Sequence, residues 1–302
     1  MIRLTLSPCG RGQGEGRGNV AAKVSLLKWQ NLFWLIGLCV WSSVAQAADS
    51  VSERIAELTA RVASYQAIGY YPEAKKQLDQ AQALLTDRAA AIDQVRLLAA
   101  WGDWLLNSHQ EDEAIKKLLE GVRQIDATPE LQPQQLLKGQ LLNNIGNAYM
   151  VQKRYSRADA SYQQALQTVA GLDGRLLLEA EIHHNQARAA MRKREFARAA
   201  SELDTAATLY RAVPDQKMRG FGLVSLGRIA LDVRRADPAV NQHLVQAWQL
   251  LTAGGELARQ SGDDRTLSYA LGYQGQGYEL DGRLGEAIQL TRQALFHAHA
   301  AQ

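Results

Sequence analysis

The side chains that could carry out catalysis or bind a metal are few, and their spacing suits neither role. His183 and His184 are adjacent, so on a helix they point about 100° apart and cannot easily hold one ion. His297 and His299 are two residues apart and do not face each other on a helix. The sequence also lacks the H-E-x-x-H, G-x-S-x-G and P-loop motifs. We therefore predict no enzyme activity, catalytic residue, metal site or cofactor, and we interpret these histidines as surface or core-edge residues.

Both cysteines and an excess of basic residues lie near the N-terminus. Because Cys9 and Cys39 are the only cysteines, residues 48–302 can hold no disulfide, Cys nucleophile or Cys metal ligand. Residues 1–47 also carry five basic residues and one acidic residue, which leaves 29 basic and 30 acidic residues in the rest of the chain. This balance gives no overall charge that favours nucleic acid as a partner.

Residues 1–47 are typical of an export signal. Two lysines precede the apolar run 32–41, and Ala45-Gln46-Ala47 supplies a cleavage site. The run is shorter than the roughly 20 residues that span a bilayer as a helix. We therefore predict cleavage after Ala47, a periplasmic or secreted location, and no stable membrane insertion of the mature chain. The alternative is an uncleaved N-terminal anchor. The glycine-rich segment 10–18 makes the basic region unusually long, which suggests that translation starts further downstream.

Residues 48–302 are rich in helix-forming Ala, Leu, Gln and Arg and repeat one two-part pattern. One copy reads Leu142-x2-Ile145-Gly146-x2-Tyr149 and then Ala158-x3-Tyr162-x2-Ala165. In each copy a small residue precedes an Ala by 12 positions, at 62/74, 102/114, 146/158, 187/199, 227/239 and 275/287. The pattern predicts an all-α fold of about six helix pairs, in units near 55–90, 95–126, 139–171, 180–212, 220–261 and 268–300.

The pattern resembles the tetratricopeptide repeat, in which two antiparallel helices form a unit and stacked units share one core. The resemblance implies a right-handed α-solenoid over residues 48–302. Gly102, Gly146 and Gly227 would lie where two helices approach most closely, because a side chain there would overpack the contact; Gly275 is the fourth such position. Asp237-Pro238 predicts the start of a long helix over 238–260.

In this family, first-helix side chains line a concave groove that receives a peptide or partner helix. The resemblance therefore implies a protein or peptide ligand, and it places ten residues on or near the groove, namely Asn143, Asn147, His184, Asn185, Arg188, Phe221, Arg228, Tyr269, Tyr273 and Gln276. An Asn amide can donate to and accept from a peptide backbone, and Arg can bind a carboxylate through two bonds.

The groove departs from the carboxylate-clamp subgroup of the family. Asn147 and Asn185 match its two asparagines, but Asn143, Phe221 and Ser225 stand where that subgroup has cations. We therefore do not predict capture of a C-terminal carboxylate. We expect Asn147→Ala with Asn185→Ala to weaken partner binding and to leave stability nearly unchanged. The alternative is that the groove positions are ordinary solvated side chains.

Two further interpretations stay open at this point. The last copy, residues 269–295, resembles the repeats in front of the CHAT domain of secreted bacterial proteins, a caspase-like module with a His/Cys pair. The chain would then be the repeat part of a longer peptidase. Alternatively, the basic clusters Lys153-Arg154, Arg192-Lys193-Arg194 and Arg234-Arg235 form a cationic edge by which an envelope-assembly scaffold contacts anionic polymer. We favour an exported, non-enzymatic scaffold; the sequence leaves its partner and oligomeric state open.

Overall fold

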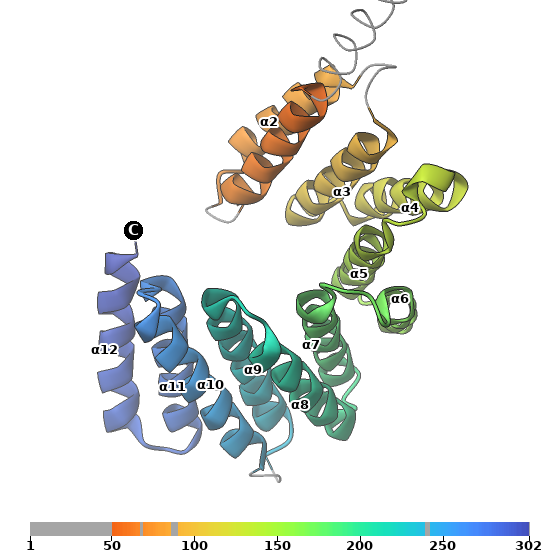
Figure 1. The fold of residues 1–302 in the computed structure, drawn as a ribbon. Helices are drawn as coiled ribbons and strands as arrows, with labels where there is room; N and C mark the ends of the chain where they lie inside the picture. The colour runs from red at the N-terminus through yellow and green to blue at the C-terminus, as the bar shows by residue number, and fades with distance from the viewer. Residues whose placement is uncertain (1–49, 67–68, 86–89, 239–241, 302) are drawn as a thin grey trace, which may run out of the picture. The chain divides into compact units, whose positions relative to one another are not determined.

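The structure, a computed structural model, describes residues 50–66, 69–85, 90–238 and 242–301. These residues form helices joined by turns, with no strand among them (Figure 1). Residues 55–302 make up one compact unit. Residues 1–47, which carry the predicted export signal, lie outside the described part of the chain. Within the described part, no helix has the length and apolar character needed to cross a membrane.

The helices follow one another at regular intervals along the chain. Residues 50–66 are helical. They are followed by α2 (Tyr71–Leu84), α3 (Ala91–Asn107), α4 (Glu111–Ala127), η1 (Pro129–Leu131), α5 (Gln135–Val151), α6 (Tyr155–Val169), α7 (Leu176–Arg192), α8 (Phe196–Ala212), α9 (Gln216–Ala236), α10 (Gln242–Gln260), α11 (Asp264–Leu280) and α12 (Leu284–Ala300).

The helices pack as consecutive pairs. From the second unit on, the pairs are α3 with α4, α5 with α6, α7 with α8, α9 with α10 and α11 with α12, and each pair also packs on the next along the chain (Figure 1). The buried side chains lie mainly within and between these pairs, because a single pair cannot cover its own apolar faces. The predicted all-α architecture of stacked helix pairs is therefore confirmed.

Glycine marks the closest approach of the two helices in three units. A Cβ atom added to Gly146 would overlap the ring of Tyr162, and one added to Gly227 would lie 2.6 Å from Cγ of Leu251. Gly102 is crowded in the same way by Leu118, and an added Cβ at Gly275 would lie 3.2 Å from the carbonyl oxygen of Ala287. The predicted role of these glycines is confirmed.

The fifth unit corrects the predicted spacing. A long helix was expected over 238–260; Pro238 lies in a turn, residues 239–241 lie outside the described residues, and α10 is described over Gln242–Gln260. Gly227 packs on Leu251, 24 residues later, whereas Gly102 and Gly146 each pack on a residue 16 positions later. The in-register alanine is therefore the fully buried Ala247, not Ala239. The reason is that α9 has 21 residues and continues past the point at which the other first helices end.

The turn inside a unit has the same backbone conformation in five units. The seventh residue after the small position has a positive φ in each of them, at Gly69, His109, Lys153, Arg194 and Gly282. His109, Lys153 and Arg194 adopt φ of 58°, 59° and 63°, although a left-handed conformation costs a residue with a Cβ about 1–2 kcal/mol. The turn therefore reverses the chain because the two helices pack together, and not because its residue type favours this conformation.

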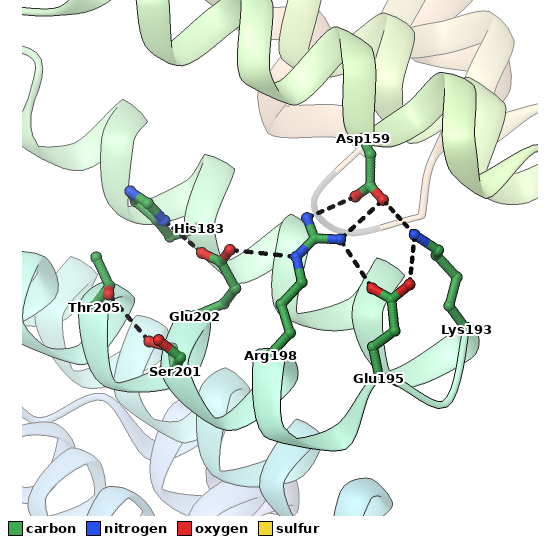
Figure 2. Close-up of polar contacts among 8 residues, drawn as sticks. All are labelled: Asp159, His183, Lys193, Glu195, Arg198, Ser201, Glu202 and Thr205. Atoms are coloured by element: carbon green, nitrogen blue, oxygen red, sulfur yellow. Dashed lines mark hydrogen bonds and ion pairs between the residues drawn. The ribbon is translucent and has the colours of Figure 1, made fainter.

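A cluster of charged side chains joins the third unit to the fourth (Figure 2). Asp159 of α6 accepts two hydrogen bonds from the Arg198 guanidinium, each 3.0 Å long, and one of 3.0 Å from Lys193 Nζ. Glu195 lies 2.7 Å from Lys193 Nζ, and Glu202 extends the cluster to His183. Although burial alone would raise it, the pKa of Asp159 lies below its usual value because Arg198 and Lys193 stabilise the carboxylate.

Two glycine substitutions test whether close helix packing sets the stability of the array. We expect Gly146→Ala to lower the free energy of unfolding by about 1–3 kcal/mol, because the buried Tyr162 ring has no room to move. Gly272→Ala is the matched control, since its added Cβ would meet Ala294 at an ordinary 3.8 Å. It should be neutral or stabilise by about 0.5–1 kcal/mol through helix propensity. Equal effects of both variants in urea unfolding would contradict this account.

Candidate binding groove

The first helices of neighbouring units contact one another along the chain. The contacts run from α3 to α5, from α5 to α7, from α7 to α9 and from α9 to α11. Each first helix therefore presents the same face beside that of its neighbours. The residue that follows the close-packing position belongs to this face, which aligns Asp103, Asn147, Arg188, Arg228 and Gln276 in successive units.

Two adjoining hollows occupy this surface between α3 and α9. The first, of about 370 Å³, is lined by Gln66, Asp103, Leu106, Asn107, Asn144, Asn147, Val151 and Arg188. The second, of about 320 Å³, is lined by Asn143, Asn144, Asn147, Leu177, Glu181, His184, Asn185, Arg188, Tyr210, Met218 and Phe221. Because Asn144, Asn147 and Arg188 line both hollows, we treat them as one groove. Six of the ten predicted residues line it: Asn143, Asn147, His184, Asn185, Arg188 and Phe221.

Amide side chains form hydrogen bonds along the groove. Asn185 Nδ2 donates to Oδ1 of Asn143 over 3.0 Å, and Oδ1 of Asn185 accepts from Arg188 over 3.4 Å. The Tyr162 hydroxyl donates to Oδ1 of Asn147 over 2.9 Å. Asn144 donates to the Asp103 carboxylate. These bonds hold the amides in fixed orientations, which is how a polar groove can be preorganised for a ligand.

This network corrects one expectation. The joint replacement of Asn147 and Asn185 by Ala would not leave stability unchanged, because Asn185 is buried and Asn147 is the hydrogen-bond partner of the buried Tyr162 hydroxyl. A buried polar group that loses its partner costs about 1–3 kcal/mol. The double variant therefore cannot separate binding from folding.

Burial lowers the pKa values of the two basic side chains that line the groove, Arg188 and His184. Burial lowers the pKa of Arg188, and nearby Arg228 adds to this effect. Burial also lowers the pKa of His184 to about 3, with contributions from Arg188 and Arg228, so the imidazole is neutral at neutral pH. In the described part of the chain no carboxylate forms an ion pair with Arg188. The guanidinium therefore presents an uncompensated charge to the groove.

Burial raises the pKa values of the two acidic side chains that line the groove, Asp103 and Glu181. Burial raises the pKa of Asp103 to about 7, and the negative charge of Glu181 contributes to the shift. Burial also raises the pKa of Glu181. Both carboxyl groups therefore favour the protonated form more than an exposed carboxyl group does.

The remaining four predicted residues lie further along the first helices and outside the two hollows. Arg228 forms an ion pair of 3.4 Å with Asp232. Tyr269 and Tyr273 stack with ring centroids 6.3 Å apart and planes at 19°. Gln276 is exposed and accepts a hydrogen bond from Arg235 over 3.4 Å. The structure thus places these polar and aromatic side chains on α9 and α11, beyond the residues that line the two hollows.

Several groove residues were not predicted from the sequence. Asp103 and Asn144 are in contact with each other, and Glu181 shifts the pKa of Asp103. The position of Asp103 could have been predicted, because Asp103 follows Gly102 as Asn147 follows Gly146. The apolar end, with Leu177 and Met218, could not be inferred in this way. Met218 lies in the first turn of α9, five residues before the repeated motif of that unit starts at Leu223.

Several histidines lie beside carboxylates within the fold. His183 and His297 each lie 2.7 Å from a carboxylate oxygen, of Glu202 and Asp264 respectively. His243 is buried and lies 3.9 Å from a carboxylate oxygen of Asp237. Among the residues that the structure describes, no group of three His, Cys, Asp or Glu side chains could hold a metal ion.

Comparisons with known proteins establish the fold. No family model matches the chain, and no curated protein is similar to it in sequence. The solved structure of BtubC (BKLC) from P. vanneervenii is similar at a TM-score of 0.55 and 16% identity, covering 83% of this chain and 91% of that chain. This likeness and the packing of consecutive helix pairs show an α-solenoid of tetratricopeptide-like units.

Two further solved structures are similar at lower scores. Pseudomonas aeruginosa pilF gives a TM-score of 0.46 at 18% identity, over 81% of this chain and 99% of that one. A putative kinesin light chain from Podosopora anserina with nearly identical TPR-like repeats gives 0.45 at 17% identity, over 70% and 97%.

The raised pKa of Asp103 predicts how stability depends on pH. Its folded pKa of about 7 exceeds the unfolded value of 3.8, so its contribution to stability is complete below about pH 4 and is lost as the pH rises to about 7. Asp103→Asn should remove this loss, which amounts to at most about 1.4 kcal/mol per pH unit. The measurement is urea unfolding from pH 4 to 8, with Asp173→Asn at an exposed loop as the control. Parallel curves for wild type and Asp103→Asn would contradict the assignment.

Proposed function

We propose that this α-solenoid is an exported scaffold that binds a peptide or protein segment in the groove between α3 and α9 and has no catalytic activity of its own. The observation that carries the proposal is the continuity of the groove. Side chains from the first helices of five consecutive units, together with Tyr210 of α8, line two hollows that share Asn144, Asn147 and Arg188. A surface assembled from several units suits an extended ligand, which can contact each unit in turn.

The polar end of the groove offers hydrogen-bond donors. In the described residues, Gln66 Nε2 is buried without a hydrogen-bond partner, and Gln66 lines the first hollow. Arg188 presents a charge that the described carboxylates do not neutralise. A buried donor without a partner is costly, so a ligand that supplies acceptor oxygens would recover this energy. Backbone carbonyls and an acidic side chain of a peptide are such acceptors.

The other end of the groove is apolar. Phe221 and Met218 are about half exposed, at 53% and 49%, and line the second hollow together with Leu177. Exposed apolar side chains beside preorganised polar groups are typical of a binding site for a short segment. The ligand that fits best therefore carries an acidic residue near an apolar one.

The experiment selects ligands and then tests where they bind. A random peptide library is displayed against the purified full chain, and the affinity of the selected peptides is measured by calorimetry. We expect Arg188→Met to weaken binding at least tenfold, about 1.4 kcal/mol, and Phe221→Ser to weaken it as well. Arg188→Met keeps part of the apolar stem and removes a desolvated charge, which offsets the loss of its hydrogen bond to Asn185. The thermal midpoint of the variant is measured alongside binding to show that it folds.

The matched control for this experiment is Val245→Ser. Val245 lies on α10, outside the groove, and its exposed fraction of 55% is close to the 53% of Phe221. If Arg188→Met and Phe221→Ser bound the selected peptides as tightly as this control, the groove would not be the binding site.

The export part of the proposal rests on the sequence of residues 1–47. We expect the protein from a bacterial envelope fraction to begin at Ala48, because the signal ends at Ala45-Gln46-Ala47. N-terminal sequencing of the purified protein measures this directly. An intact N-terminus in mature protein, retained in the membrane fraction, would favour the uncleaved anchor instead.

The two other interpretations have less support. The relation to CHAT proteins rests on the sequence of residues 269–295 alone. The cationic edge is weakened as a polymer-binding surface because Lys193 pairs with Asp159 and Glu195, and Arg235 pairs with Asp232. Charges that are paired within the fold attract an external polyanion less.

A further inference from the structure

A third hollow, of about 430 Å³, lies between α10, α11 and α12. We call it the aromatic hollow, because Trp248 of α10 and Tyr278 of α11 line it together with Glu286, Gln289 and Gln293 of α12. Its described lining residues all differ from those of the groove. Its volume lies within the range of about 300–1,000 Å³ that is typical of small-molecule sites.

Two aromatic rings form one wall of the aromatic hollow. The centroids of Trp248 and Tyr278 are 4.5 Å apart, and their planes meet at 66°. Gly277 makes room for the indole, since an added Cβ there would lie 3.3 Å from Cζ2 of Trp248. The Arg283 guanidinium lies 4.5 Å from the centroid of the Tyr278 ring. These contacts hold the two rings in place, and such rings offer C–H groups of a ligand an apolar, electron-rich surface.

The aromatic hollow occupies a place where side chains tie the third unit to the fourth. Counted from the residue that packs on the glycine of its unit, Trp248 takes the position of Asp159. Glu286 takes the position of Arg198, each 11 residues after the small residue of its unit. Asp159 and Arg198 join α6 to α8 through two hydrogen bonds of 3.0 Å (Figure 2). At the junction of the last two described units, Trp248 and Glu286 instead line an open hollow.

Stacking of units leaves this side of the array open. Gln289 and Gln293 correspond to Ala160 and Gln164 of the third unit. Ala160 and Gln164 are exposed although further units follow them in the chain. The two glutamines therefore lie at positions that are accessible in the interior of the array as well.

The polar lining supplies both donors and acceptors. Gln289 and Gln293 are exposed, and each amide offers two N–H donors and a carbonyl acceptor. Thr252 Oγ1 accepts a hydrogen bond of 3.2 Å from Nε2 of Gln274, so the threonine O–H is still able to donate. A ligand that carries several hydroxyl groups can pair with such a mixed set, because a hydroxyl also donates and accepts.

The charge of the lining is balanced. Oε1 of Glu286 accepts hydrogen bonds of 2.9 Å and 2.5 Å from Nε and Nη2 of Arg283, and these bonds lower the pKa of Glu286. A phosphate group would have to compete with Glu286 for this guanidinium, so an anionic ligand fits poorly. Among the described lining residues Leu290 is the one aliphatic side chain, so a purely apolar ligand fits poorly too.

We propose that the aromatic hollow binds a neutral saccharide. A pyranose ring has a face of C–H groups, which can pack on Trp248 or Tyr278, and a rim of hydroxyl groups, which can pair with the glutamine amides and the Glu286 carboxylate. This site is separate from the groove, and the proposal does not depend on the peptide ligand proposed for the groove.

The first test exposes the full chain to an array of neutral oligosaccharides that includes cellotetraose, maltotetraose and chitotetraose. Saccharides that bind are then titrated by saturation-transfer NMR, which detects weak complexes. We expect saturation to reach the ring C–H protons of the bound saccharide, because these protons lie nearest the aromatic rings. A chain that bound no saccharide of the array would overturn the proposal.

The second test locates the site with exposed residues, so that folding is not in question. Gln289→Ala with Gln293→Ala should weaken saccharide binding at least about tenfold, because two hydrogen-bonding groups are lost. Gln164→Ala is the matched control, since Gln164 is exposed at the corresponding position of α6, and it should bind as the wild type does. Equal binding by the double variant and this control would place the saccharide elsewhere.

The third test separates the aromatic hollow from the groove. Trp248→Leu should weaken saccharide binding, Trp248→Phe should retain more of it, and both thermal midpoints are measured alongside. Phe221→Ser in the groove should leave saccharide binding unchanged, and Trp248→Leu should leave unchanged the binding of peptides selected for the groove. If Phe221→Ser abolished saccharide binding and Trp248→Leu preserved it, the saccharide would bind in the groove and the assignment to the aromatic hollow would be wrong.

Discussion

The close contact between the two helices of a unit is the constraint on which the rest of this structure depends. At Gly102, Gly146 and Gly227 a large side chain of the second helix occupies the space that a Cβ would need. The contact fixes how far apart the helix axes lie and how they cross. Because the same contact recurs, successive units repeat the same geometry, and their first helices come side by side. The groove is a consequence of this repetition rather than of any motif dedicated to it.

The same constraint explains why unusual local conformations persist. His109, Lys153 and Arg194 hold left-handed backbone angles that glycine would adopt more easily. The packing of the two helices requires the chain to reverse direction at this turn, so the residue there adopts a positive φ despite its cost. In the fifth unit α9 continues further, and the turn lies elsewhere. Gly227 and Leu251 are nevertheless in contact, which indicates that helix packing, rather than the loop, sets how the two helices align.

Stacking also creates the electrostatic character of the groove. Asp103 and Arg188 come from different units, and each is desolvated by the helices on either side. Their pKa values move in opposite directions because burial always penalises the charged form. Hydrogen bonds to amides satisfy part of the polar surface, while the Arg188 charge stays uncompensated in the described part of the chain. A buried polar group without a partner raises the free energy of the unbound protein, so a ligand that pairs with it gains that energy on binding.

The helix pairs and the positions of close packing could be predicted from the sequence, because they depend on the local spacing of small and apolar residues. The groove face was predicted only from the resemblance to the tetratricopeptide repeat. The resemblance also marked six of the residues that the groove contains. The register of the fifth unit could not be predicted from the sequence. There Ala247 lies buried at the position that corresponds to Ala114 and Ala158, because α9 continues further than the other first helices. The structure also shows that both Asn147 and Asn185 are tied into the fold by hydrogen bonds, and that Asn185 is buried. Hydrogen bonds such as those from Tyr162 and Asn185 join residues whose meeting depends on how helices stack, and a repeat pattern does not encode that stacking locally.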